Sequence, residues 1–173
     1  IEFLRRVNSG KDIGAGHQVL VIGGGNTAVD ASRVSTRLGA GHVTILYRRS
    51  RDEMPAIRDE IAAALKEGID IETLVSPREV MVKNGHVAGL KCVKNRLGEP
   101  DSRGRRMPEP IPGSEFNIEA DSVIVAIGQV PDESLLSRLG IAVHVDVAAP
   151  GLPQVFVAGD VNQAEGGTVV KAI

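Results

Sequence analysis

One stretch, residues 19–30, constrains the fold of this chain more than any other. It reads Val-Leu-Val-Ile-Gly-Gly-Gly-Asn-Thr-Ala-Val-Asp, so an apolar run stops at consecutive glycines and a helix-like sequence follows. This order predicts a buried strand, a tight turn and the start of a helix. The spacing Gly23-x-Gly25-x-x-Ala28 is typical of a dinucleotide-binding turn, in which the second glycine lets the backbone approach a pyrophosphate.

A glycine pattern of this kind is weak by itself, because many such patterns are tight turns that bind no ligand. The strand before it and the small-residue helical face after it favour the nucleotide-binding interpretation. Backbone amides and the helix dipole would then face the phosphates. The predicted pyrophosphate-binding residues are Gly23, Gly24, Gly25, Asn26 and Thr27.

A second strand is predicted over residues 42–47, and basic residues follow it directly. NAD-preferring enzymes usually place an Asp or Glu at this point to bind the adenosine ribose hydroxyls. Here the chain has Arg48, Arg49 and Arg51 instead, and guanidinium groups form charge-assisted bonds to a 2′-phosphate. The sequence therefore favours NADPH over NADH, with Arg48 and Arg49 as the first candidates. A solvated basic loop is the alternative.

The remaining elements alternate in the manner of an α/β protein. A helix is predicted to start within residues 52–55 and to end at Gly68, and a strand over 69–74 is predicted to close at Ser76-Pro77. The buried stripe expected on that helix consists of Ile57, Ile61, Ala64 and Leu65.

Antiparallel pairing is predicted next, because Asn84-Gly85 between two apolar segments is a strong hairpin signal. Residues 95–113 are rich in Gly, Pro and charge and predict an exposed excursion, followed by a strand at 116–118. Residues 121–128 predict a buried parallel strand, and 135–139, 155–160 and 166–173 predict a short helix, a strand and a helix. The expected fold class is α/β, a Rossmann-like three-layer parallel sheet with an inserted antiparallel β-meander.

Composition excludes several function classes. A net charge of −2 gives no basis for nucleic-acid or acidic-membrane binding, and Arg103, Arg105 and Arg106 have no aromatic platform beside them and are interpreted as a solvated loop. The single cysteine, Cys92, excludes an intrachain disulfide and is expected to be a buried, inert thiol. No catalytic residue and no metal site is predicted. Without a membrane-spanning run or a signal-peptide pattern, a cytoplasmic location is expected.

Several motifs occur in one order along nearly the whole chain. They are VIGGGNTAVD (21–30), YRRSRDEMPA (47–56), LGEPDSRGRR (97–106), AIGQ (126–129), VAGD (157–160) and GTVVKAI (167–173). This set resembles the small subunit of NADPH-dependent glutamate synthase and related FAD- and NAD(P)-binding electron-input modules. The resemblance implies two Rossmann-like domains, with the NADPH domain inserted in the sequence of the FAD domain.

The resemblance also implies a division of this chain. Residues 1–15 would be a connector, 16–128 the NADPH-binding domain, and 129–173 a return linker and C-terminal fragment of the FAD-binding domain. Ala126, Ile127 and Gly128 would lie at the crossing toward FAD, and Gly159 and Asp160 in the motif that holds the flavin ribityl chain and phosphates. The chain is expected to be a fragment, with FAD bound only in the full-length protein.

The leading hypothesis is an NADPH-binding domain of a flavin-dependent oxidoreductase, which is inactive as an isolated fragment. NADPH would pass hydride to FAD, and electrons would continue to iron–sulfur clusters outside this chain or to a larger catalytic subunit. The FAD-binding portion of the same protein is then the expected partner. A non-catalytic nucleotide-binding or structural Rossmann module is the alternative. A self-contained NADP-dependent dehydrogenase would also need a proton donor and a substrate domain, and neither is visible.

Overall fold

The computed structural model describes residues 2–11, 13–14, 16–101 and 104–128. They belong to one compact unit that ends at Gly128. Its elements are α1 (Glu2–Asn8), β1 (Gln18–Ile22), α2 (Asn26–Arg37), β2 (His42–Tyr47), the 3-10 turn η1 (Arg51–Glu53), α3 (Arg58–Lys66), β3 (Asp70–Thr73), β4 (Val75–Lys83), β5 (His86–Pro100), β6 (Arg106–Glu119) and β7 (Ser122–Val125). The helix and strands expected beyond residue 128 lie outside the described residues.

Four parallel strands form the central sheet in the order β3-β2-β1-β7. Val21 of β1 lies opposite Ile45 of β2 on one side and Ile124 of β7 on the other. The chain moves from β1 outward to β2 and β3, and returns through β7 to the opposite side of β1. In such sheets the position where the strand order reverses opens a crevice at the carboxyl ends of the strands.

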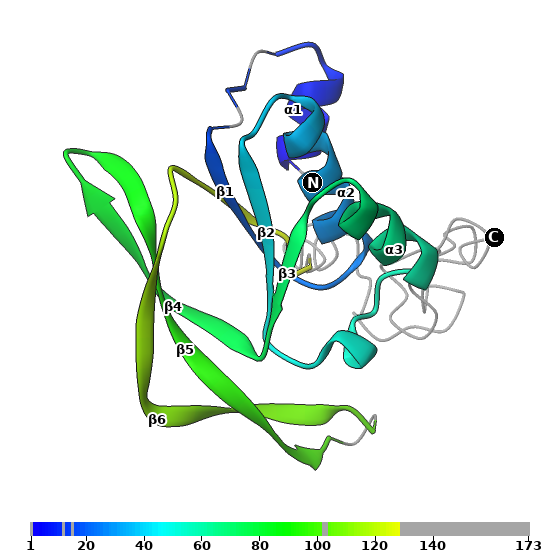
Figure 1. Cartoon of the computed structure of the whole chain (residues 1–173), viewed down its shortest axis with the longest axis vertical. Helices are drawn as coiled ribbons and strands as arrows, with labels where there is room; N and C mark the ends of the chain where they lie inside the picture. Colours follow the sequence, from blue (N-terminus) through cyan, green and yellow to red (C-terminus); the bar gives the residue numbers. More distant parts are fainter. Residues whose placement is uncertain (1, 12, 15, 102–103, 129–173) are drawn as a thin grey trace, which may run out of the picture. The chain divides into compact units, whose positions relative to one another are not determined.

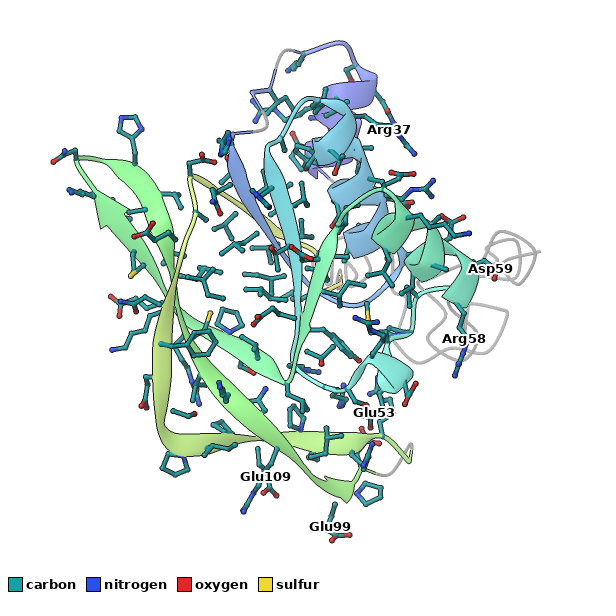
Figure 2. All side chains as sticks on the ribbon, viewed as in Figure 1. Arg37, Glu53, Arg58, Asp59, Glu99 and Glu109 are labelled. Atoms are coloured by element: carbon teal, nitrogen blue, oxygen red, sulfur yellow. The ribbon has the colours of Figure 1, made fainter. Side chains whose placement is uncertain are left out.

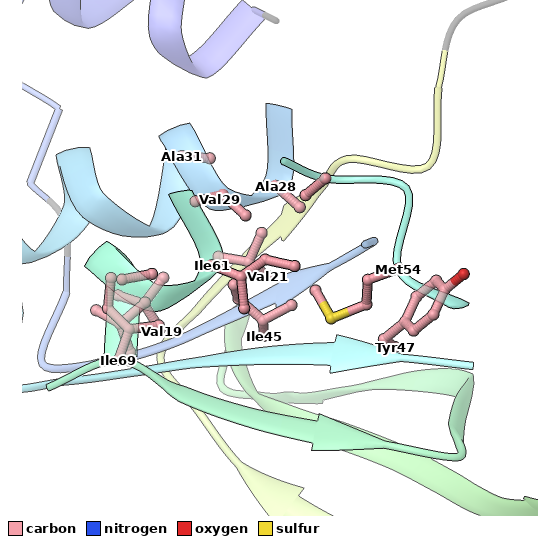
Figure 3. Packing of buried hydrophobic residues seen from close by; sticks show 13 residues of the cluster. Val19, Val21, Ala28, Val29, Ala31, Ile45, Tyr47, Met54, Ile61 and Ile69 are labelled. Atoms are coloured by element: carbon pink, nitrogen blue, oxygen red, sulfur yellow. The ribbon is translucent and has the colours of Figure 1, made fainter. Parts of the chain in front are cut away.

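One face of the parallel sheet is covered by helices (Figures 1 and 3). Val19, Val21 and Ile45 pack against α2 and α3 in a single apolar cluster. Helix α2 contributes Ala28, a residue small enough to let the helix approach the sheet closely. This face therefore forms the main core of the unit.

The other face is covered by a three-stranded antiparallel sheet in the order β4-β5-β6. Leu20 and Leu46, whose side chains alternate with those facing the helices, pack against Leu90, Cys92 and Ala120. In Figure 1 the helices lie on one side of β1–β3 and β4–β6 on the other. The expected α/β fold with an inserted antiparallel meander is confirmed, and the third layer is the insert itself.

The hairpin predicted at Asn84-Gly85 is confirmed. The two residues have φ of 53° and 78°, and Lys83 pairs directly with His86 across the turn. Two positive φ values in a two-residue connection are the signature of a type I′ turn, whose twist matches that of the flanking strands.

Much of the segment at residues 95–113 is exposed, as expected, but most of it is regular strand. Strand β5 continues to Pro100 and β6 begins at Arg106, so the segment is a second, longer hairpin arm. Prolines favour irregular structure over a strand, because they cannot donate to the hydrogen-bond ladder of a sheet. Pro108, Pro110 and Pro112 alternate along β6, so all three ring nitrogens point toward one side, and β6 is an edge strand whose outer side needs no N–H donors.

The helix expected from residues 52–55 begins later. Ser50 and Glu53 form a capping box around η1, and α3 starts only at Arg58. Met54, which precedes a proline, has an extended backbone, as the proline ring requires.

Part of the expected helical stripe is also wrong. Ile61 and Ala64 are buried, but the exposed fraction of Ile57 is 52% because it lies before the helix, and Leu65 is exposed as well. Ser76 and Pro77, expected to close the third strand, lie inside β4.

Two further segments differ from expectation. The stretch expected as a connector contains helix α1, whose Phe3 and Leu4 pack against the main core. The expected buried strand at 121–128 is the parallel strand β7, but Val125 at its end has an exposed fraction of 60%.

No helix in the described part of the chain is both long and apolar enough to cross a lipid bilayer.

Candidate functional site

A cavity of about 590 Å³ lies at the carboxyl ends of β1, β2 and β7. This is the crevice that the strand order predicts. Its lining consists of Ile22, Gly23, Gly24, Gly25, Thr27, Leu46, Tyr47, Arg48, Arg49, Pro55, Val75, Pro77, Arg105, Val125, Ala126, Ile127 and Gly128. The structure thus brings most of the sequence-predicted residues together around one cavity.

The first glycine of the turn is fixed between two neighbouring strands. The Gly23 N–H donates to the carbonyl of Leu46 at 3.0 Å, and the Ala126 N–H donates to the carbonyl of Ile22 at 2.8 Å. Gly23 has φ of 148°, and a Cβ there would lie 2.3 Å from the carbonyl oxygen of Ala126. Only glycine can therefore occupy this position without displacing the end of β7.

The second glycine packs against an aromatic ring. A Cβ on Gly24 would lie 2.4 Å from the ring of Tyr47, and the Gly24 carbonyl accepts a hydrogen bond from the Ala56 N–H at 3.1 Å. The Tyr47 hydroxyl donates to the carbonyl of Glu53 at 2.7 Å. Tyr47 thus joins the glycine turn to the segment that carries the arginines.

Helix α2 opens toward the cavity without a side-chain cap. Gly25 occupies the N-cap position, and the Asn26 side-chain oxygen accepts from the Ile57 N–H at 2.9 Å instead of capping the helix. Within the described residues, the N–H groups of Gly25, Asn26 and Thr27 donate to no protein acceptor. These are the free donors that helix geometry leaves at an N-terminus, and they favour an anion.

The arginines that follow β2 have different environments. Arg48 is exposed and lines the cavity. Arg49 also lines it but is only 4% exposed, and its Nε donates to the carbonyl of Arg106 at 2.6 Å. Arg51 is exposed at the start of η1 and is not part of the cavity lining.

The loop that bears these arginines is held by a carboxylate. Glu53 accepts hydrogen bonds from the Ser50 hydroxyl at 2.7 Å and from Arg106 at 3.3 Å (Figure 2 labels Glu53). Burial acts to raise the pKa of Glu53, but the hydrogen bonds from Ser50 and the ion pair with Arg106 outweigh it and lower that pKa. The carboxylate therefore stays ionised and ties η1 to β6.

A buried amide holds the same loop from the antiparallel sheet. Asn95 is 4% exposed, and its Nδ2 donates to the carbonyl of Arg48 at 2.9 Å and to the Ser76 hydroxyl at 2.8 Å. The insert therefore supports the backbone directly beneath Arg48.

The opposite side of the cavity is formed by the end of β7 and the residues after it. Ala126, Ile127 and Gly128 all line the cavity, and Ile127 has an exposed fraction of 74%. Gly159 and Asp160, expected to contact flavin, lie outside the described residues.

Residues 2–173 match the family described as pyridine nucleotide-disulphide oxidoreductase. The chain belongs to this family. It is 53% identical over 143 residues to the NADPH-Fe(3+) oxidoreductase subunit beta of Geobacter sulfurreducens, which covers 82% of this chain and 21% of the relative. It is 46% identical over 117 residues to the glutamate synthase [NADPH] small chain of Escherichia coli, covering 67% of this chain and 25% of that one. The resemblance to the glutamate synthase small subunit is confirmed.

The fold is shared with a solved structure. Mycobacterium tuberculosis FprA in complex with NADPH superposes with a TM-score of 0.70 at 20% identity, over 91% of this chain and 50% of that one. This chain spans only about a fifth to a quarter of the length of the two relatives named above.

Sequence reasoning missed one charged residue of this cavity. Arg105, interpreted as part of a solvated loop, lines the cavity from the turn between β5 and β6. Its position depends on the pairing of residues 95–100 with residues 106–110, which continues the meander beyond the strands that the sequence predicts. No local sequence signal distinguishes it from its neighbouring arginines.

Proposed function

We propose that residues 16–128 are the NADPH-binding domain of a flavin-dependent oxidoreductase that belongs to a longer protein. The observation that carries this proposal is that an uncapped helix start and an arginine-bearing strand end open into one cavity at the switch point of the sheet. Both features suit phosphates, one for the pyrophosphate and one for the 2′-phosphate.

The glycine turn suits the pyrophosphate because it presents backbone and no side chain. A Cβ on Gly25 would meet only Pro55, at 4.0 Å, so the space in front of the helix start is open. The N–H groups of Gly25, Asn26 and Thr27 would donate to the pyrophosphate oxygens, and the dipole of α2 would add to the attraction.

The charge of the cavity supports NADPH rather than NADH. Among its described lining residues, Arg48, Arg49 and Arg105 are basic and none is acidic. A ribose 2′-phosphate carries close to two negative charges at neutral pH and binds guanidinium groups well. An exposed Arg48 on a loop braced from two sides is suited to bind it.

The dinucleotide itself supplies the chemistry, since a bound NADPH donates hydride to a flavin. The contribution of this chain is to hold the cofactor at a fixed distance and orientation. No side-chain acid or base is needed for that step. The exposed apolar side chain of Ile127, which follows β7, would cover the cofactor from water on one side.

The rest of the proposed system lies in other parts of the protein or in other chains. We propose that FAD is held by the remainder of the full-length protein, with Gly159 and Asp160 contributing to it. The proposed further carriers are iron–sulfur clusters outside this chain and a larger catalytic subunit. Two relatives are named "subunit beta" and "small chain", and these names support an assembly with a larger subunit. The cytoplasm remains the proposed location.

Anaerobic addition of NADPH to the full-length protein tests this function. Bleaching of the flavin absorbance is expected, with Arg48→Ala requiring a higher NADPH concentration for the same rate. Arg96→Ala is the matched control, because Arg96 pairs with Glu109 on the insert and does not line the cavity. Tight NADPH binding with no flavin reduction would contradict the oxidoreductase function and favour the non-catalytic nucleotide-binding module.

A further inference from the structure

We propose that Arg105, on the turn of the inserted antiparallel sheet, is the second cation of the 2′-phosphate site and acts with Arg48 as a specificity-determining residue. Arg49, the neighbour of Arg48 in sequence, is then a positioning residue. This inference rests on the proposed NADPH-binding function and deepens it.

The two arginines converge because their neighbours are bonded to each other. Arg49 Nε donates to the carbonyl of Arg106 at 2.6 Å, so the residues that follow Arg48 and Arg105 lie in direct contact. Both Arg48 and Arg105 line the same cavity. A bound anion near this link can therefore meet a guanidinium from the parallel sheet and another from the insert.

Arg49 is poorly placed for the phosphate. It is 4% exposed, and its Nε is already committed to the Arg106 carbonyl. The carbonyl of Arg49 in turn accepts from the Leu74 N–H at 3.0 Å. Through its Nε and its backbone carbonyl, Arg49 thus holds three segments together, which is a structural task.

Arg105 has the orientation and freedom that Arg49 lacks. Its backbone N–H donates to the Asp101 carboxylate at 2.9 Å, and its Nε lies 3.5 Å from the other carboxylate oxygen. Its side chain is 53% exposed. Asp101 therefore lies beside the Nε edge of the guanidinium, and the terminal nitrogens would bind the anion in the fork geometry of arginine.

The base of the turn is also held firmly. Arg106 pairs with Glu53 at 3.3 Å, and Glu53 belongs to the loop that carries Arg48. The Asp101 N–H donates to the Arg105 carbonyl at 2.7 Å, which closes the turn. The distance between the two cation-bearing loops is therefore set by protein contacts before any ligand arrives.

The test is a calorimetric titration of the whole chain with adenosine 2′,5′-bisphosphate and with 5′-AMP, two probes that differ only in the 2′-phosphate. Arg105→Ala is expected to weaken binding of the bisphosphate by roughly tenfold, the usual magnitude for one lost charge-assisted hydrogen bond, and to leave 5′-AMP unchanged. Arg105→Lys should recover part of the loss because it keeps the charge. Arg96→Ala, a change at another exposed, ion-paired arginine of the insert, should leave both affinities unchanged.

The results separate this inference from the function on which it rests. If Arg48→Ala abolishes the preference for the bisphosphate and Arg105→Ala preserves it, the role of Arg105 is refuted and the NADPH-binding function stands. An equal loss for both probes in Arg105→Ala would also refute it, because Arg105 would then contact the part that the two ligands share. A parent chain that binds both probes equally would overturn the proposed NADPH preference itself.

Discussion

Replacement of Gly23 by alanine should destabilise the fold, because this residue joins the nucleotide turn to the end of β7. Gly23 has φ of 148°, in a region that only glycine adopts readily. The new Cβ would lie 2.3 Å from the carbonyl oxygen and 2.9 Å from the carbonyl carbon of Ala126, both of them backbone atoms. A backbone contact cannot be relieved by a rotamer change, so β1 and β7 must separate.

Two costs combine in Gly23→Ala. A residue held in a sparsely populated backbone region costs about 1–3 kcal/mol, and overpacking of a close contact costs about 1–3 kcal/mol more. The expected loss of unfolding free energy is therefore about 2–6 kcal/mol. For a chain of this size, each kcal/mol lowers Tm by about 2–4 °C, which gives a decrease of roughly 4–24 °C.

Thermal unfolding followed by circular dichroism measures this decrease, since the chain has no Trp to serve as a fluorescent probe. Gly25→Ala is the matched control. Gly25 has φ of −89°, and a Cβ there would meet only Pro55 at 4.0 Å, so Tm should change by only a few degrees, corresponding to about 1 kcal/mol or less. Its added methyl group would still obstruct a pyrophosphate. A Gly23→Ala chain that melts within about 2 °C of the parent would refute the reasoning.

Three further outcomes follow from particular contacts. Asn95→Ala removes the donor to the Arg48 carbonyl, so urea unfolding should show a loss of about 1–3 kcal/mol, and an unchanged midpoint would contradict the role given to this amide. Burial raises the pKa of Cys92 to about 11, so the thiol should react with iodoacetamide at pH 8 at least roughly 100-fold more slowly than in urea, as followed by mass spectrometry; equal rates would show that it is accessible. A hydrogen bond from Arg33 lowers the pKa of Glu67 from its usual 4.5, so the stability it contributes is present at neutral pH and is lost as the pH falls through the lowered value. Glu67→Gln should therefore flatten the acid side of a plot of Tm against pH, and identical slopes in both proteins would disprove the link.

The parallel core could be predicted from sequence because its signals are local. The run at residues 19–22 ends in glycines, and the run at 42–47 ends in arginines, so strand, turn and helix can each be assigned from adjacent residues. The Asn84-Gly85 turn is local in the same sense, since two positive φ values need those residue types.

The misjudged elements depend on contacts between distant residues. The prolines at 108, 110 and 112 indicate a loop in isolation, and only the pairing of β6 with β5 shows that they occupy the free edge of a sheet. Ser50 and Glu53 close a turn before α3, and Arg106 from the insert also binds Glu53.

In the candidate site, too, some residues can be assigned from local motifs and others depend on contacts between distant residues. The glycine turn and Arg48 lie where their local motifs predict, around the cavity. The different tasks that we propose for Arg49 and Arg105 rest on the hydrogen bond between Arg49 and the carbonyl of Arg106, which joins segments 57 residues apart. The sequence alone makes Arg48 and Arg49 equal candidates for the 2′-phosphate. The structure distinguishes them, because Arg48 is exposed and Arg49 is buried.

The most direct test of NADPH binding at this cavity is a calorimetric titration of the chain with NADPH and NADH, repeated on Arg48→Ala. We expect the parent chain to bind NADPH more tightly, and Arg48→Ala to lose roughly tenfold or more of that preference while its affinity for NADH stays the same. Equal binding of the two dinucleotides by the parent, or a preference that survives in Arg48→Ala, would contradict the assignment of the 2′-phosphate to the end of β2.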